Sequence, residues 1–193
     1  MATTAIFAEI LIVGLEAAAW LSLLIVTIFG TGWIGSDELE GWEALVTVLV
    51  LAAAYVLGIV IDRLADTAWG ELAWIHRWRK GTRDEDGERP SVPVKRLTVM
   101  AQGGAMANFL EYQRSRLRVA RATIVNLVVA IPIAAVYVGR NTDATGTQLT
   151  ALILVGAGLL AVSIFAAARI QEAFEKRLGE AYEIAVRLME RGT

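Results

Sequence analysis

The sequence contains no cysteine and a single histidine, His76. The lack of cysteine excludes disulfides, thiol nucleophiles, Cys-ligated zinc and iron–sulfur clusters, and one histidine excludes a His-rich metal site. No serine or threonine has a histidine placed for nucleophilic catalysis, and Gly103-Gly104 matches neither the Walker nor the Rossmann phosphate-binding spacing. We therefore expect no enzymatic activity, no metal and no cofactor, and we expect no nucleic-acid partner.

Charge is scarce over long stretches of the chain. The 193 residues are 56% hydrophobic, and the 18 Lys and Arg and 20 Asp and Glu gather in short segments. A soluble domain mixes charge throughout its surface. Apolar runs of bilayer length predict instead an all-α, polytopic membrane protein with four transmembrane helices. The predicted spans are Ala5–Phe29, Ala44–Ile61, Ala122–Val138 and Leu149–Ala168. Little chain remains beyond them, so residues 1–193 are expected to form a single membrane domain.

The basic residues between the spans predict the orientation. The middle connection, residues 62–121, holds twelve Lys and Arg, and the tail after Ala168 holds five. The loop Gly30–Glu43 holds none, and the loop Gly139–Gln148 holds only Arg140. Basic connections stay on the cytoplasmic side of a membrane. We therefore expect a multi-pass protein of the cell inner (plasma) membrane, with both termini and the middle connection in the cytoplasm.

Three segments are expected to form a cytoplasmic helical layer. Trp69–Lys80 is predicted to be a short helix on the inner membrane surface, because tryptophans and basic residues favour that interface. Asn108–Arg121 is predicted to run without a break into the third span, and residues 169–191 to continue the fourth. This tail helix carries an apolar stripe, formed by Ile170, Phe174, Leu178, Ala181, Ile184 and Leu188. We expect the stripe to pack on the middle connection rather than on a second subunit.

Two acidic residues in the first span are the sharpest functional signal. Glu9 and Glu16 are seven residues apart and share one face of the helix. Glu16 lies about 16 Å from Ala5 by helical rise, which is near the middle of the membrane. Intramembrane acids are candidates for ion or proton paths, and Asn126 in the third span is a further polar candidate. Alternatively, these side chains hold the helices together by hydrogen bonds.

Opposite charges meet at the inner end of the spans. Asp62 and Asp66 are four residues apart at the end of the second span, and Arg114, Arg118 and Arg121 share one face before the third. One interpretation is a belt of interfacial ion pairs that fixes the helices in register. The other is a pocket in which the arginines bind an anion or a lipid head group, since guanidinium groups grip phosphate with two hydrogen bonds.

Small residues recur four positions apart in three of the predicted spans. Such pairs permit close contact between helices, within a subunit or between subunits. The pairs are Gly14/Ala18, Ala54/Gly58 and Ala157/Ala161. They leave the number of subunits open.

These features support three functional hypotheses. The first is a homo-oligomeric channel or pore, in which Glu9 and Glu16 line a polar path and the basic layer receives a regulatory signal. The second is a non-conducting membrane anchor whose cytoplasmic layer docks a protein partner. The third is a small-solute transporter with a site built from Glu16 and Asn126. Glu16 at a symmetry axis would favour conduction, whereas Glu16 bonded inside one protomer would favour a structural role.

Overall fold

The described part of the chain consists of helices and short connections. The computed structural model describes residues 2–30, 41–79, 92–102 and 104–191. Over these ranges it contains five helices and no strand, which confirms the all-α prediction. The helices are α1 (Ala2–Phe29), α2 (Glu43–Arg79), α3 (Val92–Gln102), α4 (Gly104–Asn141) and α5 (Gly146–Arg191).

Four of the five helices are long and apolar enough to cross a membrane. Each contains a membrane-length segment of strongly apolar composition. The segments are Ile6–Phe29, Glu43–Gly70, Leu110–Asn141 and Gly146–Arg187. The remaining helix, α3, has 11 residues and spans about 16 Å, which is too short to cross a hydrocarbon core of about 30 Å. The chain is therefore a multi-pass membrane protein, as its apolar runs predict.

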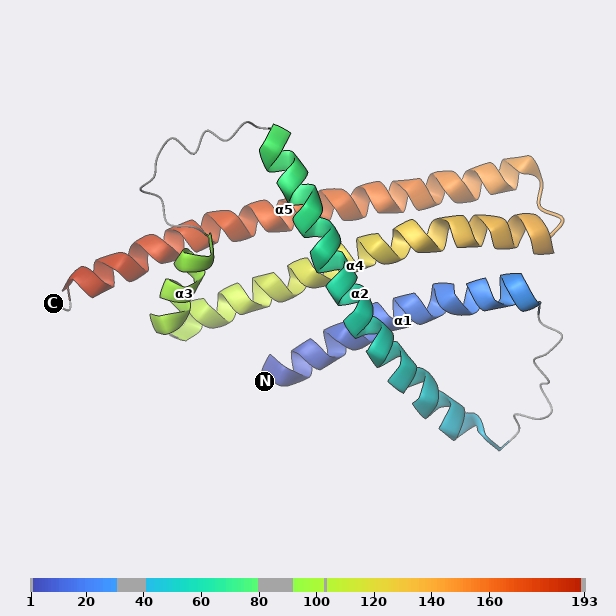
Figure 1. Ribbon diagram of the computed structural model, residues 1–193, viewed down its shortest axis with the longest axis horizontal. Helices are drawn as coiled ribbons and strands as arrows, with labels where there is room; N and C mark the ends of the chain where they lie inside the picture. The colour runs from blue at the N-terminus through green and yellow to red at the C-terminus, as the bar shows by residue number, and fades with distance from the viewer. Residues whose placement is uncertain (1, 31–40, 80–91, 103, 192–193) are drawn as a thin grey trace.

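Three helices lie side by side and the fourth long helix crosses them. In Figure 1, α4 runs between α1 and α5, and α2 passes across all three at a slant. Helix α2 packs mainly on α1 and α4, and α5 packs mainly on α4. The short α3 lies beside the second half of α5 and the start of α4. Because α4 touches every other helix, it is the element around which the structure is organised.

Helix continuity agrees with the sequence analysis in two places and differs in one. Helices α4 and α5 run unbroken out of their spans, as predicted. The separate surface helix expected over Trp69–Lys80 is instead the end of α2, which continues to Arg79. No proline follows Ile61 on α2, and the single Gly70 is tolerated within a helix. Lys80 and the side chains of residues 71–79 lie outside the described part.

A first hydrophobic core lies where α1, α2 and α4 meet. It consists of Val13 and Ala17 on α1, Ile61 and Ala65 on α2, and Ala122 on α4. Most of these side chains are small, so the three backbones approach closely. Small residues are what permit close packing between membrane helices, where no hydrophobic force distinguishes helix from lipid.

A second hydrophobic core joins α3, α4 and α5. It consists of Val99 on α3, Leu110 on α4, and Leu178, Ala181 and Ala185 on α5. The apolar stripe of the tail therefore packs on other helices of its own chain. Among the stripe residues whose side chains are described, Ile184 differs from the prediction: it is 48% exposed, and Ala185 is buried in the core in its place. The side chain of Leu188 lies outside the described part.

Local chemistry specifies the end of α1 and the start of α5. Gly30 ends α1 with φ of 72°, a left-handed conformation that glycine adopts without a steric penalty. At the start of α5, the Thr145 backbone N–H donates to Oε1 of Gln148 at 3.0 Å. This is one half of a capping box, which satisfies a backbone donor that the helix itself cannot bond.

Candidate functional site: a polar seam between α1, α2 and α4

The acidic side chains of α1 and α2 face polar side chains of α4. Along α4 these partners are Ser115, Arg118, Thr123 and Asn126, which fall on one side of the helix at 3.6 residues per turn. We call this row of contacts, from Glu9 to Trp20 on the α1 side, the polar seam. It borders the first core, so it lies inside the bundle of this single chain.

Glu16 is held at the centre of the seam by two side chains of α4, Thr123 and Asn126. The Thr123 hydroxyl lies 3.1 Å from both carboxylate oxygens of Glu16. The side-chain amide of Asn126 donates to Glu16 Oε2 at 2.9 Å and to the Val13 carbonyl oxygen at 3.1 Å. Asn126 is only 3% exposed. Its own oxygen accepts a hydrogen bond from Trp20 Nε1 at 3.1 Å, so the amide is oriented from both sides.

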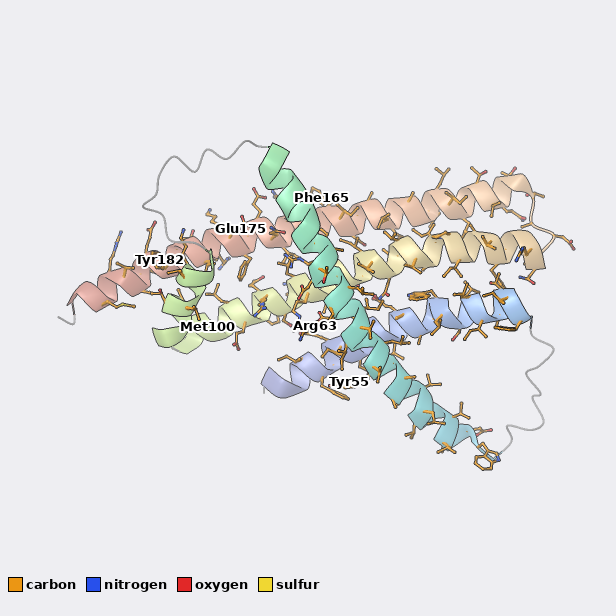
Figure 2. The ribbon with its side chains drawn as sticks, in the orientation of Figure 1. Tyr55, Arg63, Met100, Phe165, Glu175 and Tyr182 are labelled. Atoms are coloured by element: carbon orange, nitrogen blue, oxygen red, sulfur yellow. The ribbon has the colours of Figure 1, made fainter. Side chains whose placement is uncertain are left out.

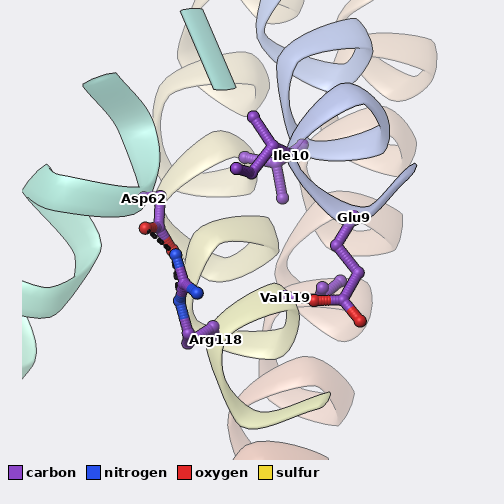
Figure 3. Close-up of a pocket in the computed structure, with 6 residues that line it drawn as sticks. Glu9, Ile10, Asp62, Arg118 and Val119 are labelled. Carbon is purple, nitrogen blue, oxygen red and sulfur yellow. Dashed lines mark hydrogen bonds and ion pairs between the residues drawn. The ribbon is translucent and has the colours of Figure 1, made fainter. Parts of the chain in front are cut away.

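Glu9 and an ion pair occupy the other end of the seam. The Ser115 hydroxyl donates to Glu9 Oε1. Arg118 binds Asp62 through two hydrogen bonds, one of them from Nε to Oδ1 at 3.1 Å. Figure 3 shows the small cleft between these groups. Its lining is Glu9, Ile10, Val13, Asp62, Arg118 and Val119.

The Asp62–Arg118 pair is partly shielded from solvent. The side chain of Asp62 is 11% exposed and that of Arg118 is 28% exposed. Two parallel N–H···O bonds between a guanidinium and a carboxylate are the strongest geometry for such a pair. The carboxylate of Asp62 therefore occupies two of the five N–H donors of Arg118.

Asp66 and Arg121 form a looser contact on the next turn of both helices. Arg121 NH1 lies 3.7 Å from Asp66 Oδ1, which is beyond hydrogen-bonding distance. The guanidinium also lies 5.4 Å from the ring centre of Trp69, a cation–π contact. The third arginine of the row, Arg114, is exposed, and of the three arginines only Arg118 lines the cleft of Figure 3.

The seam covers only part of the membrane thickness. From Glu9 to Trp20 the helical rise is about 16 Å, roughly half of a hydrocarbon core. Beyond Trp20, α1 continues with Leu21, the exposed Ser22 and Leu23–Ile25, and α4 continues with Leu127–Val129. Thr27 lies farther along α1, but its hydroxyl donates to the Leu23 carbonyl of its own helix at 2.7 Å. Within the described residues, the seam therefore ends at Trp20.

The sequence analysis predicts the charged members of the seam and Asn126. It does not predict three of their partners, the hydroxyl groups of Ser115 and Thr123 and the indole of Trp20. Their spacing could have identified them, because Ser115 and Thr123 fall on the same side of α4 as Arg118 and Asn126. Trp20 lies four residues after Glu16 and thus on the same side of α1.

Comparisons with protein-family models, with curated proteins and with solved structures found no match for this chain. The interpretation of the seam therefore depends on its geometry alone.

Proposed function

We propose that this protein is a non-conducting membrane anchor. Four membrane helices hold a helical layer, made of α3 and the adjoining parts of α4 and α5, at the cytoplasmic face of the inner membrane, where it docks a protein partner. The observation that carries the proposal is that Glu16, the deepest acid, is bonded by Thr123 and Asn126 of its own chain. A side chain bonded in this way holds α1 and α4 together.

The extent of the seam supports the same proposal. A continuous polar path must reach both faces of the membrane, whereas the described contacts of this seam end at Trp20 and the next residues of α1 are mostly apolar. The basic middle connection and tail favour a cytoplasmic position for the helical layer. The second core gives this layer a packed interior of its own, so it can present a defined surface to a partner.

The first test measures ion flux through liposomes that contain the purified protein. We expect proton and potassium flux no greater than in protein-free liposomes. Glu16→Gln keeps a hydrogen-bond acceptor for Asn126 and a donor for Thr123, so we expect this variant to fold normally. Glu16→Leu removes both and should lower the stability of the bundle. Flux that the wild type shows and Glu16→Gln abolishes would overturn the anchor proposal.

The second test locates the partner by photo-crosslinking in cells. A photoreactive residue at Glu183, exposed on the tail of α5, is compared with one at Val155, exposed in its membrane segment. We expect a discrete protein adduct from position 183 and only lipid or background adducts from position 155. The reverse pattern would contradict a docking layer built from the tail.

One observation favours the oligomeric channel as a second candidate. Glu9 and Glu16 are half-buried rather than sealed, and each contacts a hydroxyl group, on Ser115 and Thr123. A hydroxyl donates to an ionised carboxylate and accepts from a protonated one, so both protonation states of these acids keep a partner. Conduction would then require several copies around an axis to complete the path. The liposome measurement decides between the two candidates.

A further inference from the structure

Arg121 and four other side chains form a polar cluster between three helices. Arg121 comes from α4, Asp66 and Trp69 from α2, and Gln171 and Glu175 from α5; we call them the Arg121 cluster. Trp69 Nε1 donates to Gln171 Oε1 at 3.0 Å, and Gln171 Nε2 donates to Glu175 Oε1 at 3.0 Å. Figure 2 labels Glu175 on α5, near the place where α2 passes across that helix. The cluster thus links α2 to α5.

Arg121 has hydrogen-bonding capacity that its present contacts do not use. Its contact with Asp66 is 3.7 Å long, and its buried Nε has no hydrogen-bond partner among the described residues. Arg118, one turn earlier, is by contrast fixed by two bonds to Asp62. A guanidinium carries five N–H donors, so Arg121 can take a second carboxylate or exchange one for another.

A second carboxylate belongs to the same cluster. The Arg121 guanidinium lies 5.4 Å from the ring centre of Trp69, Trp69 donates to Gln171, and Gln171 donates to Glu175. Asp66 on α2 and Glu175 on α5 both attract the guanidinium, whereas Arg114 on α4 repels it. The attracting groups sit on different helices. Movement of the Arg121 side chain from one to the other therefore changes which helix this side chain binds.

The cluster lies between the two hydrophobic cores. Asp66 directly follows Ala65, a member of the first core, and Glu175 precedes Leu178, a member of the second, by three residues. Helices α2 and α5 have almost no packing contact with each other. Besides the continuous helix α4, these polar side chains are therefore the main connection from α2 to the tail of α5.

We propose that Arg121 is a switch residue that exchanges between Asp66 and Glu175 and so couples the position of the α5 tail to that of α2. When Arg121 pairs with Asp66, it adds an ion pair between α4 and α2, and Glu175 keeps its hydrogen bond from Gln171. When it pairs with Glu175, it adds an ion pair between α4 and α5, and its own contact with α2 is lost. This coupling does not depend on the proposed function, because it exists whether or not a partner binds.

The test uses the absence of cysteine in the native chain. Spin labels are placed at Ala68→Cys on α2 and Glu180→Cys on α5, both exposed positions, and the distance distribution is measured in lipid nanodiscs. Asp66→Asn removes one competitor and Glu175→Gln removes the other. We expect them to shift the ratio of two distance populations in opposite directions, by about two- to fivefold, the effect of one partly exposed ion pair.

A purely structural joint would behave differently. If the Arg121 cluster only held α2 and α5 together, both variants would weaken it and both would broaden the distance distribution. That result, or no change in either variant, would overturn the proposal. The matched control is Glu172→Gln, which alters an exposed acid three residues from Glu175 that pairs with Arg169, and we expect no shift. If Asp66→Asn fails to fold, the exposed Glu175→Gln must still move the ratio while the control does not.

Discussion

The close crossing of α1 and α2 makes the strongest quantitative prediction. A Cβ atom built on Gly14 would lie 1.6 Å from the backbone oxygen of Ala54, and one on Gly58 would lie 2.0 Å from the backbone oxygen of Ile10. The obstructing atoms belong to helix backbones, which cannot rotate away. The sequence predicts that these small residues permit close contact, and the structure places them against each other within one chain.

Replacing Gly14 with alanine must therefore push the two helices apart. An ordinary contact between a carbon and a carbonyl oxygen is about 3.3 Å, so α2 has to move by roughly 1.7 Å at this point. Overpacking of a well-packed core costs about 1–3 kcal/mol and occasionally more. Because the displacement also opens the first core around Val13 and Ile61, we expect Gly14→Ala to cost about 3 kcal/mol.

The assay is equilibrium unfolding of the purified protein in detergent or bicelles, followed by circular dichroism and tryptophan fluorescence. The matched controls are Gly158→Ala on α5 and Gly70→Ala on α2, where nothing lies within 4 Å of the added Cβ. Alanine favours a helix over glycine by about 0.5–1 kcal/mol, so both controls should be neutral or slightly stabilising. If Gly14→Ala is as stable as Gly158→Ala, the close crossing is not part of the native fold.

Two further changes test the ion pair and the second core. Asp62→Leu leaves Arg118 partly buried without its carboxylate and should cost about 2–4 kcal/mol, whereas the double variant Asp62→Leu/Arg118→Met should recover most of that loss in the same unfolding assay. Equal stability of the single and double variants would show that the pair is not formed. In the second core, Leu178→Ala removes a side chain that is 1% exposed and should cost about 2–4 kcal/mol, while Leu154→Ala, at a 66% exposed position on the same helix, should cost much less. Comparable losses at both positions would mean that the tail does not pack as described.

The fold was predictable because lipid leaves the backbone few choices. A chain crossing hydrocarbon must satisfy its N–H and C=O groups within the segment, so an apolar run of about 20 residues predicts a helix. The unbroken α4 was predictable for a similar reason, since no proline or glycine lies between Leu117 and Val129. The slant of α2 was not predictable, because it depends on how Gly14 and Gly58 fit against the facing backbone, and spacing alone does not give that fit.

The hydroxyl partners in the seam were hidden for a different reason. Threonine in a helix usually bonds the carbonyl four residues earlier, and Thr27, Thr47 and Thr67 all do so here. Thr123 instead donates across the interface to Glu16. Nothing in the residue type separates these two cases. Only the rotation of α4 relative to α1 decides which hydroxyl meets a carboxylate, and that rotation follows from the whole packing arrangement.

Two kinds of contact determine how the helices pack: close shape complementarity between α1 and α2, and hydrogen bonds between α4 and its neighbours. Helices α1 and α2 meet through glycine and backbone at Gly14 and Gly58, a contact set by shape. Helix α4 is bound to α1 through Asn126 and to α2 through Arg118 by hydrogen bonds. In lipid, apolar burial does not favour one rotation of a helix over another, whereas a misplaced amide or guanidinium leaves an unsatisfied polar group. The seam therefore fixes the rotation of α4, and through α4 the position of the second core.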